Sequence, residues 1–252
     1  MHSLDAYIGV RQPDGNWVFH LPMGAKLARF RDERVAAILT GGIPVSLSPT
    51  LPLVVLHIVP AGVFADSDRL LPSASAPGQT NLPPLDAHGW DGRNNFDGYV
   101  TYSSNSGQPP SIDSYLQVYH TGAIEAVAAR LIDYSDDLQD RAFAGSYFER
   151  QVIETTERYL QVTEKLNVQT PFYFFLSLLR VRGYRIQADG RLRNHPGREF
   201  DRDHLLVPAL ELTGGDDVPT ALKPSFDRVW QSGGWGKSPC YDQGGHRIAE
   251  HR

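Results

Sequence analysis

Seven arginines lie within residues 180–202 and form the densest group of ligand-binding side chains in the chain. Guanidinium groups hold phosphate through paired hydrogen bonds, and Tyr184 and Phe200 stand among them as a stacking surface for bases would require. We therefore hypothesise a phosphate- or nucleic-acid-binding segment. Its candidate residues are Arg180, Arg182, Arg185, Arg191 and Arg193. The alternative is a solvated hairpin with Asp189-Gly190 at its turn and charged pairs on its outer face.

The polar stretch GWDGRNNFDGYVTY, residues 89–102, has the oxygen-rich composition of a cation-binding loop. If Gly98 is the glycine at position 6 of a calcium loop, Asn95 and Asp97 fit ligand positions 3 and 5, but position 12 is Ser104 and not the glutamate that such a loop needs. Position 1 is then Arg93, and a guanidinium cannot ligate calcium. The spacing therefore argues against a calcium site.

We interpret the same stretch as a structural turn that starts a strand. Asp and Asn side chains bond their own backbone in such turns, and we expect Gly92 and Gly98 to adopt positive φ angles. The polar residues of this turn are Asp91, Arg93, Asn95 and Asp97. The Arg93 guanidinium is expected to pair with one of the two aspartates.

The remaining histidines outside residues 201–204, the cysteine and the glycine patterns do not indicate a metal, cofactor or catalytic site. His57 lies in an apolar run and His120 at the end of another, which indicates hydrogen-bonded structural histidines. Cys240 has no activating neighbour in sequence, so we interpret it as an incidental thiol. The patterns G-x-x-x-x-G-K-[ST], G-x-G-x-x-G and G-x-S-x-G are all missing from the sequence. We therefore expect no metal and no cofactor, and the residues favour a non-enzymatic role.

A hydrolase remains as a third hypothesis, because residues 201–204, DRDH, combine carboxylates with an imidazole. Consecutive residues of a strand point to opposite faces, so this hypothesis needs a pocket in which Asp201 and His204 converge.

The bulk composition restricts the class of protein. A length of 252 residues is enough for a core without crosslinks, and a single cysteine cannot form an internal disulfide. The N-terminus lacks a signal-peptide pattern, and the longest apolar runs are too short to cross a bilayer. A net charge of −5 disfavours a surface that binds nucleic acid everywhere. We expect a cytoplasmic protein without membrane contact.

The elements before residue 150 are predicted to be mostly strands. A hairpin around Pro13-Asp14-Gly15 and a helix over residues 25–40, ended by Gly41-Gly42, form an appendage of residues 1–45. Leu53–Pro60 is predicted to be a strand covered on both faces, followed by a long surface loop over residues 65–87. Residues 96–104 and 114–132 are two β-rich runs joined by a long connection.

The remaining elements complete an α+β core over residues 46–235, with an irregular tail over residues 236–252. A long helix is predicted to begin at a capping box formed by Ser146 and Glu149. Its apolar stripe is expected to pack on a sheet centred on Phe172–Leu179. Residues 204–212 form a strand interrupted by Pro208 and hence an edge, and residues 223–231 form a short helix. The fold class is α+β: a mostly antiparallel sheet with helices mainly on one face.

Five ordered segments together resemble a known family. The segments are LVVLHIVP, GWDGRNNFDGYVTY, SYLQVYHTGAIEAV, FFLSLLRVRGYRI and LKPSFDRVW. They are similar to the C-terminal region of bacterial proteins that carry a Schlafen AlbA-type DNA-binding domain, often described as ATP-binding. The resemblance covers residues 28–230, but the AlbA-type domain itself is missing or reduced to the first few dozen residues. No nuclease residue or nucleotide site is therefore carried over.

The resemblance implies an accessory domain of an AlbA-type bacterial effector or regulator, acting in sensing, ligand recognition or self-association. The expected partner is a second copy of the chain or an unidentified ligand, and Trp90, Trp230 and Trp235 are candidate exposed aromatics for such a surface. The alternative function is nucleic-acid binding or RNA processing through the arginine-rich segment.

Overall fold

The computed structural model describes residues 8–11, 13, 17–64, 82–104, 111–133, 141–188 and 197–248. The chain divides into two compact units, Met1–Ile43 and Pro44–Arg252. Most of the predicted loop over residues 65–87, the Asp189-Gly190 turn, Arg191 and Arg193 lie outside the described residues.

The smaller unit holds a hairpin and a helix. Strands β1 (Ile8–Arg11) and β2 (Trp17–His20) pair antiparallel, as the sequence predicts. Helix α1 (Met23–Thr40) ends at Gly41, whose φ of 83° is the left-handed conformation expected of a helix-terminating glycine. The Gly41 N–H bonds back to the last turn and so satisfies carbonyls that the helix leaves open.

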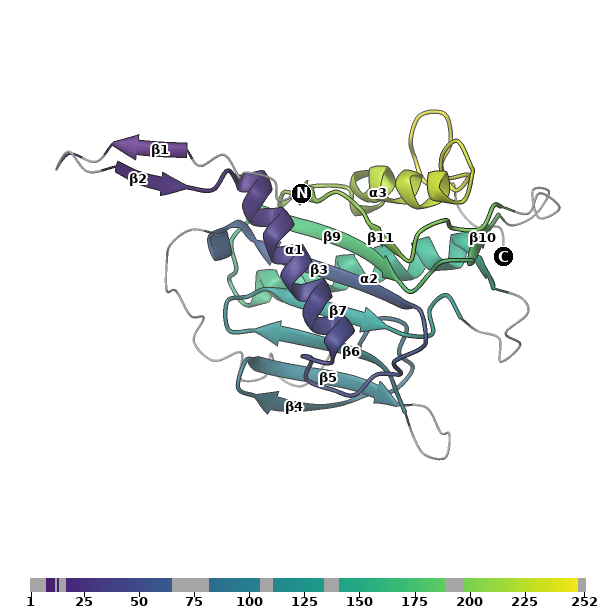
Figure 1. The fold of residues 1–252 in the computed structure, drawn as a ribbon, viewed down its shortest axis with the longest axis horizontal. Helices are drawn as coiled ribbons and strands as arrows, with labels where there is room; N and C mark the ends of the chain where they lie inside the picture. Colours follow the sequence, from purple (N-terminus) through teal and green to yellow (C-terminus); the bar gives the residue numbers. More distant parts are fainter. Residues whose placement is uncertain are drawn as a thin grey trace. The chain divides into compact units, whose positions relative to one another are not determined.

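The larger unit is built on a sheet of eight strands with antiparallel pairing throughout (Figure 1). The strand order is β11-β9-β3-β7-β6-β5-β4, and β12 also pairs with β9. The strands are β3 (Leu53–Pro60), β4 (Asp91–Asn95), β5 (Gly98–Ser104), β6 (Ile112–Tyr119), β7 (Ile124–Ala128), β9 (Phe172–Leu179), β11 (His204–Leu206) and β12 (Leu210–Leu212).

Strands β3 and β9 lie in the interior of the sheet and pair along their full lengths, from Leu53 opposite Leu179 to Pro60 opposite Phe172. Every residue of β3 is buried, and all but one of β9 are buried. This burial explains why both sequences are continuous apolar runs without alternation. Pro208 separates β11 from β12, and both pair with the outer side of β9, so the predicted interrupted edge is present.

Helices α2 (Gly145–Lys165) and α3 (Val218–Ser232) cover one face of this sheet. Their buried side chains share a core with alternate residues of the strands; examples are Phe148 of α2, Phe226 of α3 and Leu56 of β3. The fold is therefore α+β with a mostly antiparallel sheet, as predicted. No helix in the described part of the chain is both long and apolar enough to span a membrane.

The predicted capping box at the start of α2 is wrong. The N-cap position is Ala144, and no side chain caps this helix end. Glu149 points into the core instead, where it is completely buried and accepts hydrogen bonds from Trp230 Nε1 (2.6 Å) and Ser238 Oγ (2.5 Å). Glu149 does not cap the helix because it lies on the same buried side of the helix as Phe148 and Val152.

Helix α3 begins earlier than predicted, at Val218. The Asp217 carboxylate caps the helix by accepting from the Thr220 N–H at 3.2 Å, and Pro219 sits in the first turn, where proline is tolerated. Two further strands, β8 (Ala142–Ala144) and β10 (Arg185–Gln187), were not predicted from the sequence and form a small parallel pair. A short 3-10 helix, η1 (Ala61–Phe64), follows β3.

Candidate functional site

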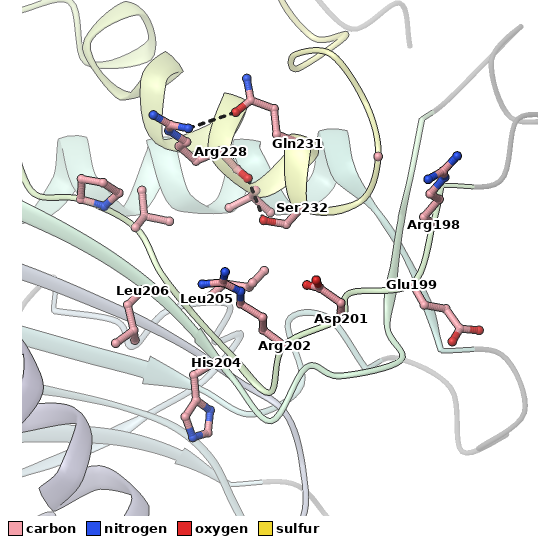
Figure 2. A pocket seen from close by; sticks show the side chains of 14 residues that line it. Arg198, Glu199, Asp201, Arg202, His204, Leu205, Leu206, Arg228, Gln231 and Ser232 are labelled. Atoms are coloured by element: carbon pink, nitrogen blue, oxygen red, sulfur yellow. Dashed lines mark hydrogen bonds between the residues drawn. The ribbon is translucent and has the colours of Figure 1, made fainter. Parts of the chain in front are cut away.

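A cavity of about 660 Å³ lies between the segment leading into β11 and the C-terminal half of α3 (Figure 2). We call it the arginine cavity, because Arg198, Arg202 and Arg228 all line it. Its other polar lining residues are Glu199, Asp201, His204, Gln231 and Ser232, and its apolar lining is Leu205, Leu206, Val207, Pro208 and Val229.

Backbone hydrogen bonds fix the segment that carries Arg198 and Arg202. The Phe200 N–H donates to the Tyr184 carbonyl at 2.8 Å, and the Val181 N–H donates to the Asp203 carbonyl at 2.9 Å. The Phe200 side chain is buried against Phe143, with ring centroids 6.1 Å apart. The alternating arrangement leaves the neighbouring charged residues on the outside of an anchored segment.

The other wall of the cavity is the exposed side of α3. Val229 and Trp230 are buried, so Arg228, Gln231 and Ser232 fall on the outer side of the last turns. The Arg228 guanidinium donates to Gln231 Oε1 at 3.5 Å (Figure 2). These positions follow from the helical period of the apolar stripe.

Gly234 joins the two walls after α3. It has a φ of 83°, and a Cβ atom built on it would lie 3.0 Å from the Arg198 Cγ and Cδ atoms. The Arg198 N–H also donates to the Gly233 carbonyl at 2.7 Å. A glycine is therefore required here both for the backbone conformation and for the close approach of the arginine stem.

The lining carries a net positive charge, because it holds three arginines and two carboxylates. All three arginine side chains are exposed, and within the described part of the chain neither Arg198 nor Arg202 forms a side-chain ion pair. In Figure 2 the Arg202 guanidinium and the Asp201 carboxylate both point toward α3. Such an arrangement offers charged donors to an anion, and the carboxylate offers an acceptor to hydroxyl or amino groups beside it.

The five predicted arginines do not line this cavity where the structure describes them. Arg180 has a φ of 59°, and its Nη1 atom donates to the carbonyls of Ser48 (3.3 Å) and Leu51 (3.2 Å). Burial lowers the pKa of this guanidinium, with Asp203 opposing the shift. Arg180 therefore ties two backbone segments together.

The other predicted arginines are spread apart. Arg182 is exposed in the turn after β9, and Arg185 lies on β10, whose neighbour is β8. Arg191 and Arg193 lie outside the described residues. Arg198 and Arg202, from the end of the same arginine-rich segment, line the cavity. Arg228 also lines it, and its only signal in the sequence is its place on the polar side of a helix.

Asp201 and His204 do not converge as a hydrolase would require. Both line the arginine cavity, but Figure 2 shows their side chains on opposite sides of the chain. His204 Nδ1 lies 3.5 Å from Asp203 Oδ2 and 3.4 Å from the Arg180 backbone nitrogen. The hydrolase hypothesis therefore lacks its required geometry.

Most of the predicted polar turn is strand: residues 91–95 form β4, and only Phe96 and Asp97 turn the chain into β5. Asn95 Oδ1 accepts from the Asp97 N–H at 3.1 Å, and Asn95 Nδ2 donates to Gln117 Oε1 at 2.6 Å. Asp91 Oδ1 accepts from the Gly92 N–H at 2.7 Å. Each of these side chains therefore bonds nearby backbone or a neighbouring strand.

Two details of this turn differ from expectation. Gly98 has a φ of 146°, whereas Gly92 stands within strand β4 and not in a left-handed conformation. Arg93 donates to the Pro44 carbonyl at 3.0 Å and not to Asp91 or Asp97. Pro44 is distant from Arg93 in the sequence, so local residues could not predict this hydrogen bond.

His57 belongs to a buried polar cluster on the sheet face opposite α2. Its Nε2 atom lies 2.9 Å from Glu125 Oε2, while Tyr115 and Tyr119 donate to Glu125 Oε1 at 2.8 and 3.3 Å. Within the described residues, no three His, Cys, Asp or Glu side chains are placed to hold a metal ion. His57 is thus a hydrogen-bonded core histidine.

The C-terminal tail contacts the core at Glu149. Arg247 Nη1 pairs with Glu149 Oε2 at 3.2 Å.

The three predicted exposed tryptophans differ in burial. Trp230 is completely buried, which corrects its prediction as an exposed aromatic. Trp90 is 40% exposed, and Trp235 is partly buried against Trp230. Burial, and then the nearby Glu149, raise the pKa of the Cys240 thiol to about 12, so the thiol is unsuited to nucleophilic chemistry.

Comparison of the chain with protein-family models, with curated proteins and with solved structures gave no significant match.

Proposed function

We propose that the chain is a non-enzymatic ligand-recognition domain, and that its larger unit binds a phosphate-bearing small molecule in the arginine cavity. The observation that carries this proposal is that Arg198, Arg202 and Arg228 line one cavity from two separate segments. A guanidinium donates two parallel hydrogen bonds to phosphate oxygens, so three exposed ones favour an anion with several oxygens.

The rest of the lining favours a ligand that is more than a bare phosphate. Asp201 and Glu199 accept hydrogen bonds from hydroxyl or amino groups, and Leu206 and Pro208 supply accessible apolar area for an uncharged part. A nucleotide combines these three features. The cavity volume of about 660 Å³ lies within the range of small-molecule sites.

The three arginines differ in the contacts that they already make. The Arg198 N–H donates to the Gly233 carbonyl and the Arg198 stem lies against Gly234, while the Arg228 guanidinium donates to Gln231, so both have structural contacts without any ligand. Arg202 stands on the facing segment and forms no side-chain ion pair with any residue that the structure describes (Figure 2). Arg202 is therefore the most informative residue to change.

The resemblance to AlbA-type proteins gives this proposal its setting. Its motifs form the sheet and the helix that position the cavity: LVVLHIVP is β3, and LKPSFDRVW lies in α3. We propose on this basis an accessory domain of a cytoplasmic bacterial effector or regulator, in which ligand binding is the sensing step.

Calorimetric titration with ADP, adenosine and inorganic pyrophosphate tests the proposal. We expect ADP and pyrophosphate to bind and adenosine to bind at least tenfold more weakly, because charge-assisted hydrogen bonds contribute about 1.5–3 kcal/mol each. Arg202→Gln should weaken ADP binding by about tenfold or more for the same reason.

Arg182→Gln is the matched control, because Arg182 is exposed and lies outside the cavity. An unchanged affinity in this variant supports the cavity. If Arg182→Gln weakens binding as much as Arg202→Gln, or if a single-stranded oligonucleotide binds with a steep salt dependence while ADP does not bind, the site is a nucleic-acid surface and the proposal is wrong.

A further inference from the structure

A second cavity, of about 730 Å³, lies at the other end of the larger unit. We call it the Trp90 cavity. Its walls come from the turn before β4, from the ends of β5 and β6, and from the start of α2. The stretch that looked like a calcium loop thus contributes Gly89, Trp90 and Asp91 to a cavity wall.

Trp90 gives this cavity an accessible aromatic surface. Its side chain is 40% exposed, although tryptophan normally loses most of its surface on folding. Tyr102 also lines the cavity and stands directly opposite Asp91 in the pairing of β4 with β5, so both side chains are on one face. Leu85 and Leu131 are fully buried and provide an apolar base.

Asp86 brings a carboxylate into the same cavity at an energetic cost. Its φ of 60° lies in the left-handed region, and its Oδ1 atom accepts from the Tyr147 hydroxyl at 2.6 Å. Burial raises the pKa of Asp86, and the Tyr147 hydrogen bond and the charge of His88 only partly offset this effect. A carboxylate in this position gains from any cation that enters the cavity.

The carboxylates of the cavity are not equally neutralised. Asp113 pairs with Arg130 at 3.3 Å. Within the described part of the chain, neither Asp86 nor Asp91 pairs with a lysine or arginine. The cavity is therefore lined by two carboxylates without a lysine or arginine partner among the described residues and by the partly exposed Trp90 side chain.

We infer that the Trp90 cavity binds a small organic cation, an ammonium or guanidinium compound, with its charge between the Asp86 carboxylate and the face of the Trp90 indole. Aromatic rings attract cations through the negative charge of their faces, and tryptophan does so most strongly. The site is independent of the arginine cavity, which presents the opposite charge and different elements.

Titrations with choline, agmatine and 3,3-dimethylbutan-1-ol test this inference. The last compound has the shape of choline without its charge. We expect at least one of the two cations to bind with saturation, and the neutral compound to bind at least about tenfold more weakly, as a cation–aromatic site requires. Comparison of the agmatine and choline affinities shows whether the cavity prefers a guanidinium or a quaternary ammonium group.

Two variants and a control locate the binding. Asp86→Asn and Trp90→Leu should each weaken cation binding by about tenfold, and Trp90→Phe should retain part of it. Asp97→Asn, in the exposed turn of the same hairpin, should leave the affinity unchanged. Circular dichroism establishes that each variant is folded, and Trp90→Leu decides the question if Asp86→Asn does not fold.

The inference is overturned if neither cation saturates at millimolar concentration, if the neutral compound binds equally well, or if Trp90→Leu binds as the unchanged protein does. Loss of ADP binding in the arginine-cavity variants has no bearing on these results.

Discussion

Replacement of Glu149 by alanine should destabilise the protein more than any other single loss of a carboxylate in α2. Glu149 is completely buried and accepts from Trp230 Nε1, Ser238 Oγ and Arg247 Nη1. Alanine removes all three acceptor contacts at once. Trp230 and Ser238 are also completely buried, so water cannot replace the lost partner without opening the core.

The magnitude follows from these partners. Each buried donor left without an acceptor costs about 1–3 kcal/mol, and the Trp230 and Ser238 donors together give about 2–6 kcal/mol. Removal of one partner of a buried ion pair costs about 3–5 kcal/mol in comparable cases, and Arg247 is 18% exposed. We therefore expect Glu149→Ala to lower the free energy of unfolding by about 3–5 kcal/mol.

Urea unfolding followed by far-ultraviolet circular dichroism measures this loss. Glu154→Ala is the matched control, because Glu154 is exposed on the same helix and should change stability by less than about 0.5 kcal/mol. A loss of less than about 1 kcal/mol for Glu149→Ala would refute the reasoning, since it would mean that the three donors find other partners.

The pH dependence of the free energy of unfolding tests the burial of Glu149 independently. Burial raises the pKa of Glu149 above its ordinary value of 4.5, and the hydrogen bonds from Ser238 and Trp230 and the charge of Arg247 oppose the shift without cancelling it. The folded state therefore holds this proton more tightly than the unfolded state, and the stability linked to it is present below pH 4.5 and lost as pH rises through the folded pKa. Glu149→Gln cannot titrate, so the stability of the unchanged protein relative to this variant should fall as pH rises above 4.5. A relative stability that rises over this range would contradict the assignment.

Three further predictions concern single positions. Gly145→Ala should lower the free energy of unfolding by about 1–3 kcal/mol, because the new Cβ would overlap the Trp230 ring at Cζ2, whereas Gly62→Ala, which meets open space, should cost little. Arg180→Ala should cost about 1–2 kcal/mol in urea unfolding without changing ADP affinity, since its guanidinium bonds two backbone carbonyls, and a loss of ADP affinity would contradict this structural role. The Cys240 thiol, with its pKa raised to about 12, should react with a disulfide reagent at pH 8 much more slowly in the folded than in the urea-unfolded chain, and equal rates would show that it is exposed.

The elements that the sequence predicts well are those with a long and uniform burial pattern. β3 and β9 are continuous apolar runs because both of their faces are covered, and α2 shows its stripe over 21 residues. Helix α1 is predicted to within a few residues because Gly41 and Gly42 mark its end. In each case one local pattern contains the information.

The sequence-based predictions are wrong where a contact with a residue distant in the sequence determines the local structure. Ser146 and Glu149 have the spacing of a capping box, yet Glu149 is taken into the core by Trp230 and by a tail residue 98 positions away. The predicted run over residues 114–132 is split into β6 and β7 by Gly122, whose φ of 82° makes a tight turn. β8 and β10 are three residues long, too short for any period to show.

The candidate site was predictable only in part. The arginine-rich segment contributes Arg198 and Arg202 to the cavity lining, but neither is among the five arginines selected from the sequence, and Arg180 bonds backbone carbonyls instead. Arg228 joins them through the return of the chain from β12 into α3, which no spacing within the segment reveals.

The arginine Nε–H resonances of the protein, followed by nuclear magnetic resonance during titration with ADP, test the central claim most directly. We predict that the resonances of Arg202 and Arg228 shift together and saturate at the same ADP concentration, while that of Arg182 stays in place. Shifts confined to Arg182, or no saturable shift at Arg202, would contradict phosphate recognition in the arginine cavity.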